Sequence, residues 1–181
     1  MHACDYGSRP SSDRGSFPII GETVLDRGAE LMPRVFRVMR EDKDGLPNVA
    51  TSATGLGVRT GVDIDLDPRG NVLVNGKGMS VSPDWRHVPL FRIPERLRHL
   101  KQGARGPNKN SCFRYGTGTF ERGHFAAGLT LEPDTPTHGT IAPAAPVPLS
   151  DYGDALAATR SGWEKDERYY PGKKVSHPCT Y

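Results

Sequence analysis

The sequence predicts an α+β domain of short, mostly antiparallel strands, and three observations lead to that class. The 181 residues include 21 Gly and 16 Pro, a content that keeps strands short and loops numerous and argues against a helical bundle. The apolar residues, 35% of the chain, gather in clusters, which argues against disorder. Residues 33–40 alternate as a strand does. The length suits one domain with its own core.

The leading strand, residues 33–40, is rich in Val and Phe and places Arg37 among apolar neighbours. Further short strands are expected at residues 56–59, 62–64, 71–74, 76–82, 129–131 and 140–141. Between two of them, Asp67-Pro68-x-Gly70 is a turn signal, because Pro presets φ and Gly tolerates a positive φ. Residues 103–111 are expected to form a flexible basic loop.

Two helices are expected. The first covers residues 94–101, since Pro94 suits the first helical turn and Gly103 can end the helix. The second covers residues 151–166, after Ser150 as N-cap. Its apolar face consists of Tyr152, Leu156, Thr159 and Trp163.

We therefore expect one domain over residues 33–168, between a flexible N-terminal segment (residues 1–32) and a C-terminal tail (residues 169–181). No apolar run approaches the ~20 residues of a membrane helix, and the N-terminus lacks the apolar region of a signal peptide. A cytoplasmic protein without membrane contact is expected, and any delivery to another cell would not use a signal peptide.

The charge and the cysteines indicate which ligands, partners and redox compartment to expect. A net charge of +3 and a pI near 8.8 suit a phosphate-bearing ligand or an acidic protein, and they fall short of the values that mark a nucleic-acid binder. The three cysteines, Cys4, Cys112 and Cys179, form neither a disulfide framework nor a zinc spacing. A reducing compartment, a free thiol at Cys112 and no metal site are therefore expected.

Familiar catalytic signatures, such as a phosphate-binding P-loop or a nucleophile elbow, are absent from the sequence. Arg37 is the first candidate, because a buried guanidinium must be paired or face a cleft, and Arg captures anions with two donors at once. The alternative is an arginine at an edge strand with its head in solvent. Ser80 and Ser82 form the second candidate, since residues i and i+2 share a strand face, and Gly78 lets a ligand approach. The alternative is an ordinary polar face.

His138 is the third candidate, because the small residues on either side of it leave room for a flat ring or a sugar. A structural histidine at a strand start is the alternative. By composition, Ser80 and His138 could belong to a hydrolase triad, but their spacing does not support one. Glu121 and Glu132 are carboxylates within reach of such a cleft, and each also suits the surface.

A set of motifs occurs in a characteristic order. The motifs are Phe36-Arg37, Asp44-Gly45-Leu46, Gly78-x-Ser80-Val81, His138-x-Thr140-Ile141-x-Pro143-Ala144-x-Pro146, and Trp163-Glu164-Lys165 near the end of the last expected helix. This order resembles the type VI secretion exported toxins that have an ADP-ribosyltransferase-like fold and act in the target cytoplasm. The resemblance spans about residues 33–168. Its most telling parts are the His-x-Thr-Ile run and the final Trp-Glu-Lys.

The resemblance implies a single ADP-ribosyltransferase-like domain, with two packed sheets, a few flanking helices and a cleft for NAD as substrate. It assigns NAD binding to Arg37, Gly78, Met79, Ser80, His138 and Thr140. It assigns catalysis to Arg37, Ser80, His138 and Glu121. The Glu-x-Glu pair that is usual in such folds is absent, so that His138 or Glu121 would take its place.

The expected function is that of an NAD-dependent toxin, which transfers ADP-ribose to a cytoplasmic macromolecule or hydrolyses NAD. The resemblance also implies a neutralising immunity protein as partner. One alternative is an RNA-directed NAD-using transferase, suggested by the basic residues of segment 101–109 with Arg92, Arg96 and Arg98. Another is a non-enzymatic interaction module that keeps the fold, suggested by the missing glutamate pair.

Overall fold

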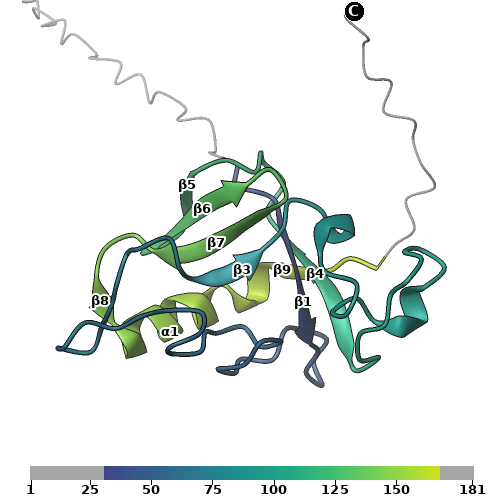
Figure 1. Cartoon of the computed structure of the whole chain (residues 1–181), viewed down its shortest axis with the longest axis horizontal. Helices are drawn as coiled ribbons and strands as arrows, with labels where there is room; N and C mark the ends of the chain where they lie inside the picture. The colour runs from purple at the N-terminus through teal and green to yellow at the C-terminus, as the bar shows by residue number, and fades with distance from the viewer. Residues whose placement is uncertain (1–30, 168–181) are drawn as a thin grey trace, which may run out of the picture. The chain divides into compact units, whose positions relative to one another are not determined.

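A computed structural model describes residues 31–167 of the chain (Figure 1). The expected N-terminal segment up to residue 30, the tail beyond residue 167, Cys4 and Cys179 lie outside the described residues. The strands of the described part are β1 (Val35–Arg40), β2 (Asn71–Val72), β3 (Met79–Val81), β4 (Asn110–Tyr115), β5 (Gly123–Ala126), β6 (Leu129–Thr135), β7 (His138–Pro143), β8 (Val147–Pro148) and β9 (Trp163–Lys165). Its helices are α1 (Leu149–Ala158) and three short 3₁₀ turns, η1 (Trp85–His87), η2 (Glu95–Leu97) and η3 (Arg160–Gly162).

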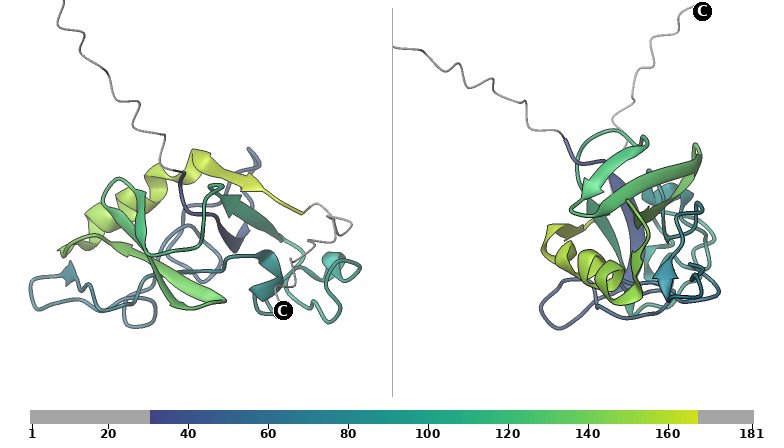
Figure 2. Two further views of the ribbon diagram at one scale, coloured as in Figure 1. Left: turned by 90° about the horizontal axis from the view of Figure 1, so that it is seen from above. Right: turned by 90° about the vertical axis from the view of Figure 1, so that its left-hand side faces the viewer.

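The strands form three antiparallel sheets. One sheet has the order β1-β4-β9, a second has the order β3-β7-β6-β5, and β2 pairs with β8 in a short ribbon. The views in Figure 2 show α1 lying along one side of these sheets. The predicted α+β class with mostly antiparallel strands is confirmed. The structure contains the strands expected at residues 33–40, 71–74, 76–82, 129–131 and 140–141, which correspond to β1, β2, β3, β6 and β7. Of these, β2 is shorter than expected.

One β-bridge joins the backbones of the two larger sheets. The Phe36 N–H donates to the Ser82 carbonyl at 2.7 Å, and the Ser82 N–H donates back to the Phe36 carbonyl at 3.0 Å. In the described part of the chain this is the sole β-bridge between the β1 strand and the segment of β3. The two strands therefore separate on either side of it, and the Arg37 side chain occupies the gap that opens.

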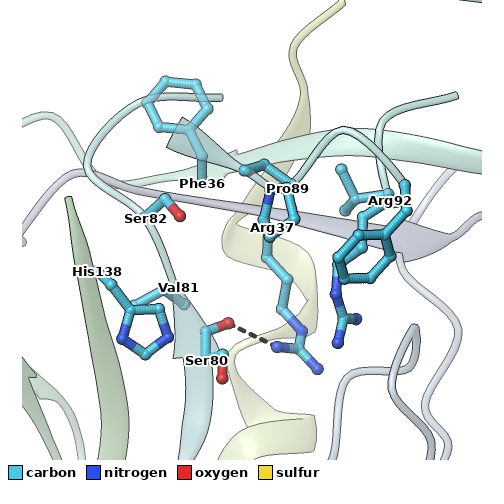
Figure 3. Close-up of a pocket in the computed structure, with 11 residues that line it drawn as sticks. Phe36, Arg37, Ser80, Val81, Ser82, Pro89, Arg92 and His138 are labelled. Carbon is cyan, nitrogen blue, oxygen red and sulfur yellow. Dashed lines mark hydrogen bonds between the residues drawn. The ribbon is translucent and has the colours of Figure 1, made fainter. Parts of the chain in front are cut away.

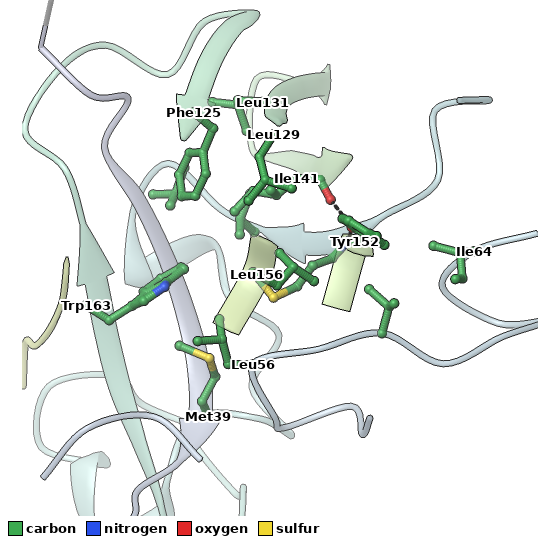
Figure 4. Close-up of a cluster of buried hydrophobic side chains, with 14 of the residues drawn as sticks. Met39, Leu56, Ile64, Phe125, Leu129, Leu131, Ile141, Tyr152, Leu156 and Trp163 are labelled. Carbon is green, nitrogen blue, oxygen red and sulfur yellow. Dashed lines mark hydrogen bonds between the residues drawn. The ribbon is translucent and has the colours of Figure 1, made fainter. Parts of the chain in front are cut away.

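The main hydrophobic core lies between the two larger sheets and α1 (Figure 4). Tyr152 and Leu156 of α1 pack into it beside Trp163 of β9, and all three are buried. The Tyr152 hydroxyl donates to the Ile141 carbonyl at 2.5 Å and accepts from the Met79 N–H at 3.3 Å, which ties α1 to β7 and β3. Burial of this phenol raises its pKa.

Segment 85–109 packs against β1 and β4 and forms a smaller hydrophobic core with them. Its buried residues are Val38, Val88, Ile93, Leu97, Ala104 and Cys112. Cys112 is a free thiol, as expected, and burial raises its pKa to about 12. A thiol that stays protonated in this way is a weak nucleophile. The longest described helix, α1, has ten residues, and no helix within residues 31–167 has the length and apolar character that crossing a bilayer requires.

Both helix predictions need correction. Where residues 94–101 were expected to be helical, the structure has the single 3₁₀ turn η2. The segment folds back on itself there: Pro94 forms a β-bridge with Gly106, and the Glu95 N–H donates to the Gly106 carbonyl at 3.0 Å. The second helix ends at Ala158 instead of residue 166. Its expected last turn is the strand β9, in which Trp163 pairs with Tyr115 of β4.

The segments 56–59 and 62–64 form no strand: residues 56–57 are bends, residues 62–63 lie in a turn, and Ile64 forms only an isolated bridge with Thr60. A Cβ on Gly57 would lie 2.6 Å from the Ala50 carbonyl oxygen, so the chain folds back closely there. Arg59 then closes the following turn with two side-chain hydrogen bonds to Asp63, each 2.9 Å long. The end of the expected basic loop, from Asn110, belongs to strand β4.

Candidate functional site

A pocket of about 240 Å³ lies where β1 and β3 separate (Figure 3). It is formed by β1, by β3 with the residue after it, by the segment 88–92 and by the first residue of β7. Its lining residues are Phe36, Arg37, Val38, Ser80, Val81, Ser82, Val88, Pro89, Phe91, Arg92 and His138. Arg37, Ser80 and His138, which the sequence singled out separately, therefore meet in one pocket.

Arg37 is 7% exposed, and its guanidinium is bound by carbonyl groups alone. It donates to the Ser80 carbonyl at 2.5 Å, and to the carbonyls of Ala53 and Gly55 at 3.4 and 3.3 Å. Its Nε–H has no partner in the described structure. A buried cation without a carboxylate partner costs folding free energy, which marks this side chain as a candidate for binding an anion.

Arg92 brings a second guanidinium beside the first. It donates to the same Ala53 carbonyl at 2.5 Å, and Figure 3 shows its side chain extending in the same direction as that of Arg37. Burial and the charge of Arg92 lower the pKa of Arg37 to about 10. Burial and the charge of Arg59 lower the pKa of Arg92 as well.

Asp63, the carboxylate whose charge acts on both guanidinium groups, is already bound to another arginine. Asp63 binds Arg59 with both oxygens at 2.9 Å, and among residues 31–167 neither Arg37 nor Arg92 forms an ion pair. Two guanidinium groups that form no ion pair and have spare donors suit an anion that offers several oxygens, such as a phosphate or a diphosphate.

His138 faces the pocket from the start of β7, and Asp134 holds its ring. The Nδ1 atom of His138 lies 2.8 and 2.9 Å from the two carboxylate oxygens of Asp134. The β6–β7 hairpin turns at Pro136 and Thr137, which brings these two residues together. Because Nδ1 is engaged, Nε2 is the ring nitrogen that remains for a ligand.

The two serines occupy different environments. Ser80 is exposed towards the pocket, and its carbonyl is occupied by Arg37. Ser82 is 5% exposed, and its backbone forms the bridge to Phe36. Figure 3 shows His138 beside Ser80, but no hydrogen bond joins the two in the described structure. The nucleophile–base contact of a hydrolase triad is therefore missing.

Four other sequence-predicted site residues lie outside the pocket lining. Gly78 packs against β7, since a Cβ there would lie 2.3 Å from the Ile141 carbonyl oxygen. Met79 is 1% exposed in the main core, and the Thr140 hydroxyl donates to the Gly76 carbonyl at 3.1 Å. Glu121 is exposed between β4 and β5. Their assigned roles towards NAD stay predictions, and the packing explains Gly78 and Met79 without a ligand.

Sequence reasoning missed Phe91 and Asp134 and did not connect Arg92 with Arg37. Arg92 stood out as a cation, but its position depends on the return of segment 88–92 over β1. The proline-containing turn before His138 was a usable signal for Asp134, because a tight hairpin brings residues on its two strands together. Glu132, the other carboxylate considered, forms an ion pair with Arg122.

A second hollow, of about 500 Å³, is lined by Leu31, Arg34, Pro83 and residues 117–120. It has one charged side chain and no histidine. The first pocket, which we call the arginine pocket after Arg37 and Arg92, therefore has the better set of groups for chemistry. Comparison with protein-family models, with curated proteins and with solved structures finds no match for this chain.

Proposed function

We propose that the arginine pocket binds NAD as a substrate, and that the chain is a toxin that transfers ADP-ribose from NAD or hydrolyses it. The observation that carries the proposal is the buried pair of Arg37 and Arg92, which lacks a carboxylate partner and lies beside Ser80 and His138. NAD offers a diphosphate for the guanidinium pair and a ribose for the hydroxyl and imidazole groups.

The size of the pocket determines which part of NAD it would hold. A volume of about 240 Å³ is below the roughly 300–1,000 Å³ of sites that enclose a whole drug-sized ligand. We therefore place the nicotinamide ribose and the diphosphate inside. The adenosine half would lie at the rim, where the Phe91 side chain is 56% exposed.

In the reaction, the bond between the nicotinamide nitrogen and ribose C1′ breaks, and its electron pair leaves with nicotinamide. Water or an acceptor then bonds to C1′ and gives up a proton, for which His138 Nε2 is the acceptor in this pocket. Asp134 keeps the ring in the tautomer that this requires. No Asp or Glu is among the pocket-lining residues, so the cationic sugar lacks direct stabilisation by a carboxylate and turnover is expected to be slow.

The test is release of nicotinamide from NAD by the purified protein. Arg92→Gln removes one guanidinium from a half-exposed loop position, and Arg37→Lys keeps the charge but loses the two-donor geometry. Each change is expected to lower the rate about 10- to 100-fold, the worth of a hydrogen bond to a charged group. Arg40→Gln is the matched control, since Arg40 is exposed at the end of the same strand. Equal rates in all four proteins would refute the proposal.

Thermal unfolding separates this proposal from the interaction-module alternative. A ligand that binds only the folded state raises the melting temperature, so NAD, ADP-ribose and pyrophosphate are each expected to raise it. The effect should be smaller in Arg92→Gln. A protein that is unaffected by millimolar NAD and pyrophosphate would instead be a module that has the fold without the substrate.

A further inference from the structure

The positive charge of the chain is concentrated in one segment. Residues 85–109 contain seven Lys or Arg residues and one acidic residue, Glu95. In the rest of the chain acidic residues outnumber basic ones, which is why the whole chain has a net charge of only +3. Such asymmetry indicates a binding surface more directly than the total charge does.

The fold gathers these cations on one side of the molecule. The segment returns on itself over the small core, so that Lys101 Nζ donates to the Arg86 carbonyl at 2.9 Å. The Arg98 Nε–H donates to the Ala104 carbonyl, and the Arg105 N–H donates to the Leu90 carbonyl, both at 3.0 Å. In Figures 1 and 2 this teal segment lies beside β4, away from α1.

Several of the cations have no negative partner. Arg105 and Lys109 are exposed, and neither forms an ion pair with any residue that the structure describes. Two others have only local partners: Arg98 forms an exposed ion pair with Glu95, and Arg86 forms one with Asp84 at the start of η1. Like charges held this close repel one another, and a polyanion would relieve that repulsion.

An exposed aromatic ring lies next to the cations. Phe91 is 56% exposed, and the Arg92 guanidinium carbon lies 5.7 Å from its ring centroid. Cations that follow phosphates, combined with an aromatic face on which a base can stack, are the features of surfaces that bind single-stranded nucleic acid. Unpaired bases are common in RNA but transient in DNA.

From these observations we propose that residues 85–109 form a docking surface for single-stranded RNA. Phe91 and Arg92 also line the arginine pocket, so bound RNA would lie at its mouth. The RNA binding itself does not depend on NAD. It can therefore fail while the proposed NAD reaction holds, and the reverse is also true.

The test is fluorescence anisotropy of a labelled single-stranded RNA of about 12 nucleotides, within the range that such surfaces cover, with the full chain at about 50–200 mM salt. The double variant Arg105→Gln/Lys109→Gln should weaken binding and reduce the slope of log K against log salt by about 1.4, or about 0.7 per lost phosphate contact. Phe91→Ala should weaken binding by about 5- to 150-fold, the worth of one stacked base.

Lys43→Gln/Arg69→Gln is the matched control, because both residues are exposed cations outside the segment. It should bind RNA as the parent does. Absence of binding at the lowest salt, or an equal loss in the control, would overturn the proposal. Equal affinity for single-stranded DNA, duplex DNA or phosphatidylserine vesicles would also overturn it. Nicotinamide release measured without RNA reports separately on the NAD reaction.

Discussion

At the scale of single residues, Gly78 and Arg37 contribute to the protein in different ways. The sequence suggested that Gly78 lets a ligand approach, whereas the structure shows it packed against β7, with the Ile141 carbonyl oxygen 2.3 Å from the place of a Cβ. At the same scale, Arg37 is held by three carbonyl groups, and its Nε–H is left without a partner. The first residue serves the packing of the domain, and the second costs stability in a way that a ligand would offset.

We therefore expect Gly78→Ala to destabilise the fold by about 1–3 kcal/mol, the usual cost of overpacking, because the methyl group must push β3 away from β7. Urea unfolding measures the change. Gly123→Ala is the control, since no atom lies within 4 Å of a Cβ at that position. Comparable loss in both variants would contradict the steric explanation.

Among the elements, β9 shows how tertiary contacts replaced a helical turn. Trp163 packs into the main core, and Lys165 donates to Glu41 at 2.7 Å, while the Ser111 hydroxyl donates to the same carboxylate oxygen at 2.6 Å. These hydrogen bonds, that of Lys165 first, hold the pKa of Glu41 below its usual value of 4.5. The carboxylate thus links the end of β1 to both β4 and β9.

The lowered pKa sets the direction of a pH effect. Because the folded state favours the charged carboxylate, its contribution to stability is fully present above pH 4.5 and is lost as pH falls through the lower folded-state pKa. Glu41→Gln should cost about 0.2–1 kcal/mol at pH 7, and its difference from the parent should shrink below pH 4.5. Thermal unfolding from pH 7 to pH 3 measures this, with Glu121→Gln as an exposed control. A difference that stays constant with pH would contradict it.

For the whole molecule, the decisive feature is that the backbones of its two larger sheets are joined by the bridge between Phe36 and Ser82, with the arginine pocket beside it. A ligand in the pocket contacts both sheets at once, so it should resist their separation. Binding and the stability of this junction are therefore coupled.

Hydrogen exchange can test this coupling. NAD at about 100 times its Kd should slow exchange of the Phe36 and Ser82 amides by up to about 100-fold if they exchange through separation of the sheets. The Gly45 amide, in the turn after β1, should exchange at an unchanged rate, because that turn opens locally. Unchanged exchange at Phe36 and Ser82 with NAD bound would show that the ligand binds elsewhere.

Local patterns predicted much of this protein from its sequence. The strand β1 was identified by its alternation and its Val and Phe residues, since side-chain period is a property of the chain itself. Short strands were also expected at residues 129–131 and 140–141, which lie within β6 and β7. Arg37 stood out because it interrupts an apolar strand. Ser80 stood out because it shares a strand face with Ser82, and His138 because small residues flank it. These features need no knowledge of which segments become neighbours.

The tertiary structure decided what depends on distant partners. The helical period through Trp163 was outweighed by pairing with β4, since helix preferences amount to only tenths of a kcal/mol per residue. Arg92 reached Arg37, and Asp134 reached His138, only because a loop and a hairpin fold back. Sequence alone thus determined which residues are unusual in their strands, and the folded chain determined which of them meet, because the free energy of such contacts belongs to pairs of residues far apart in the chain.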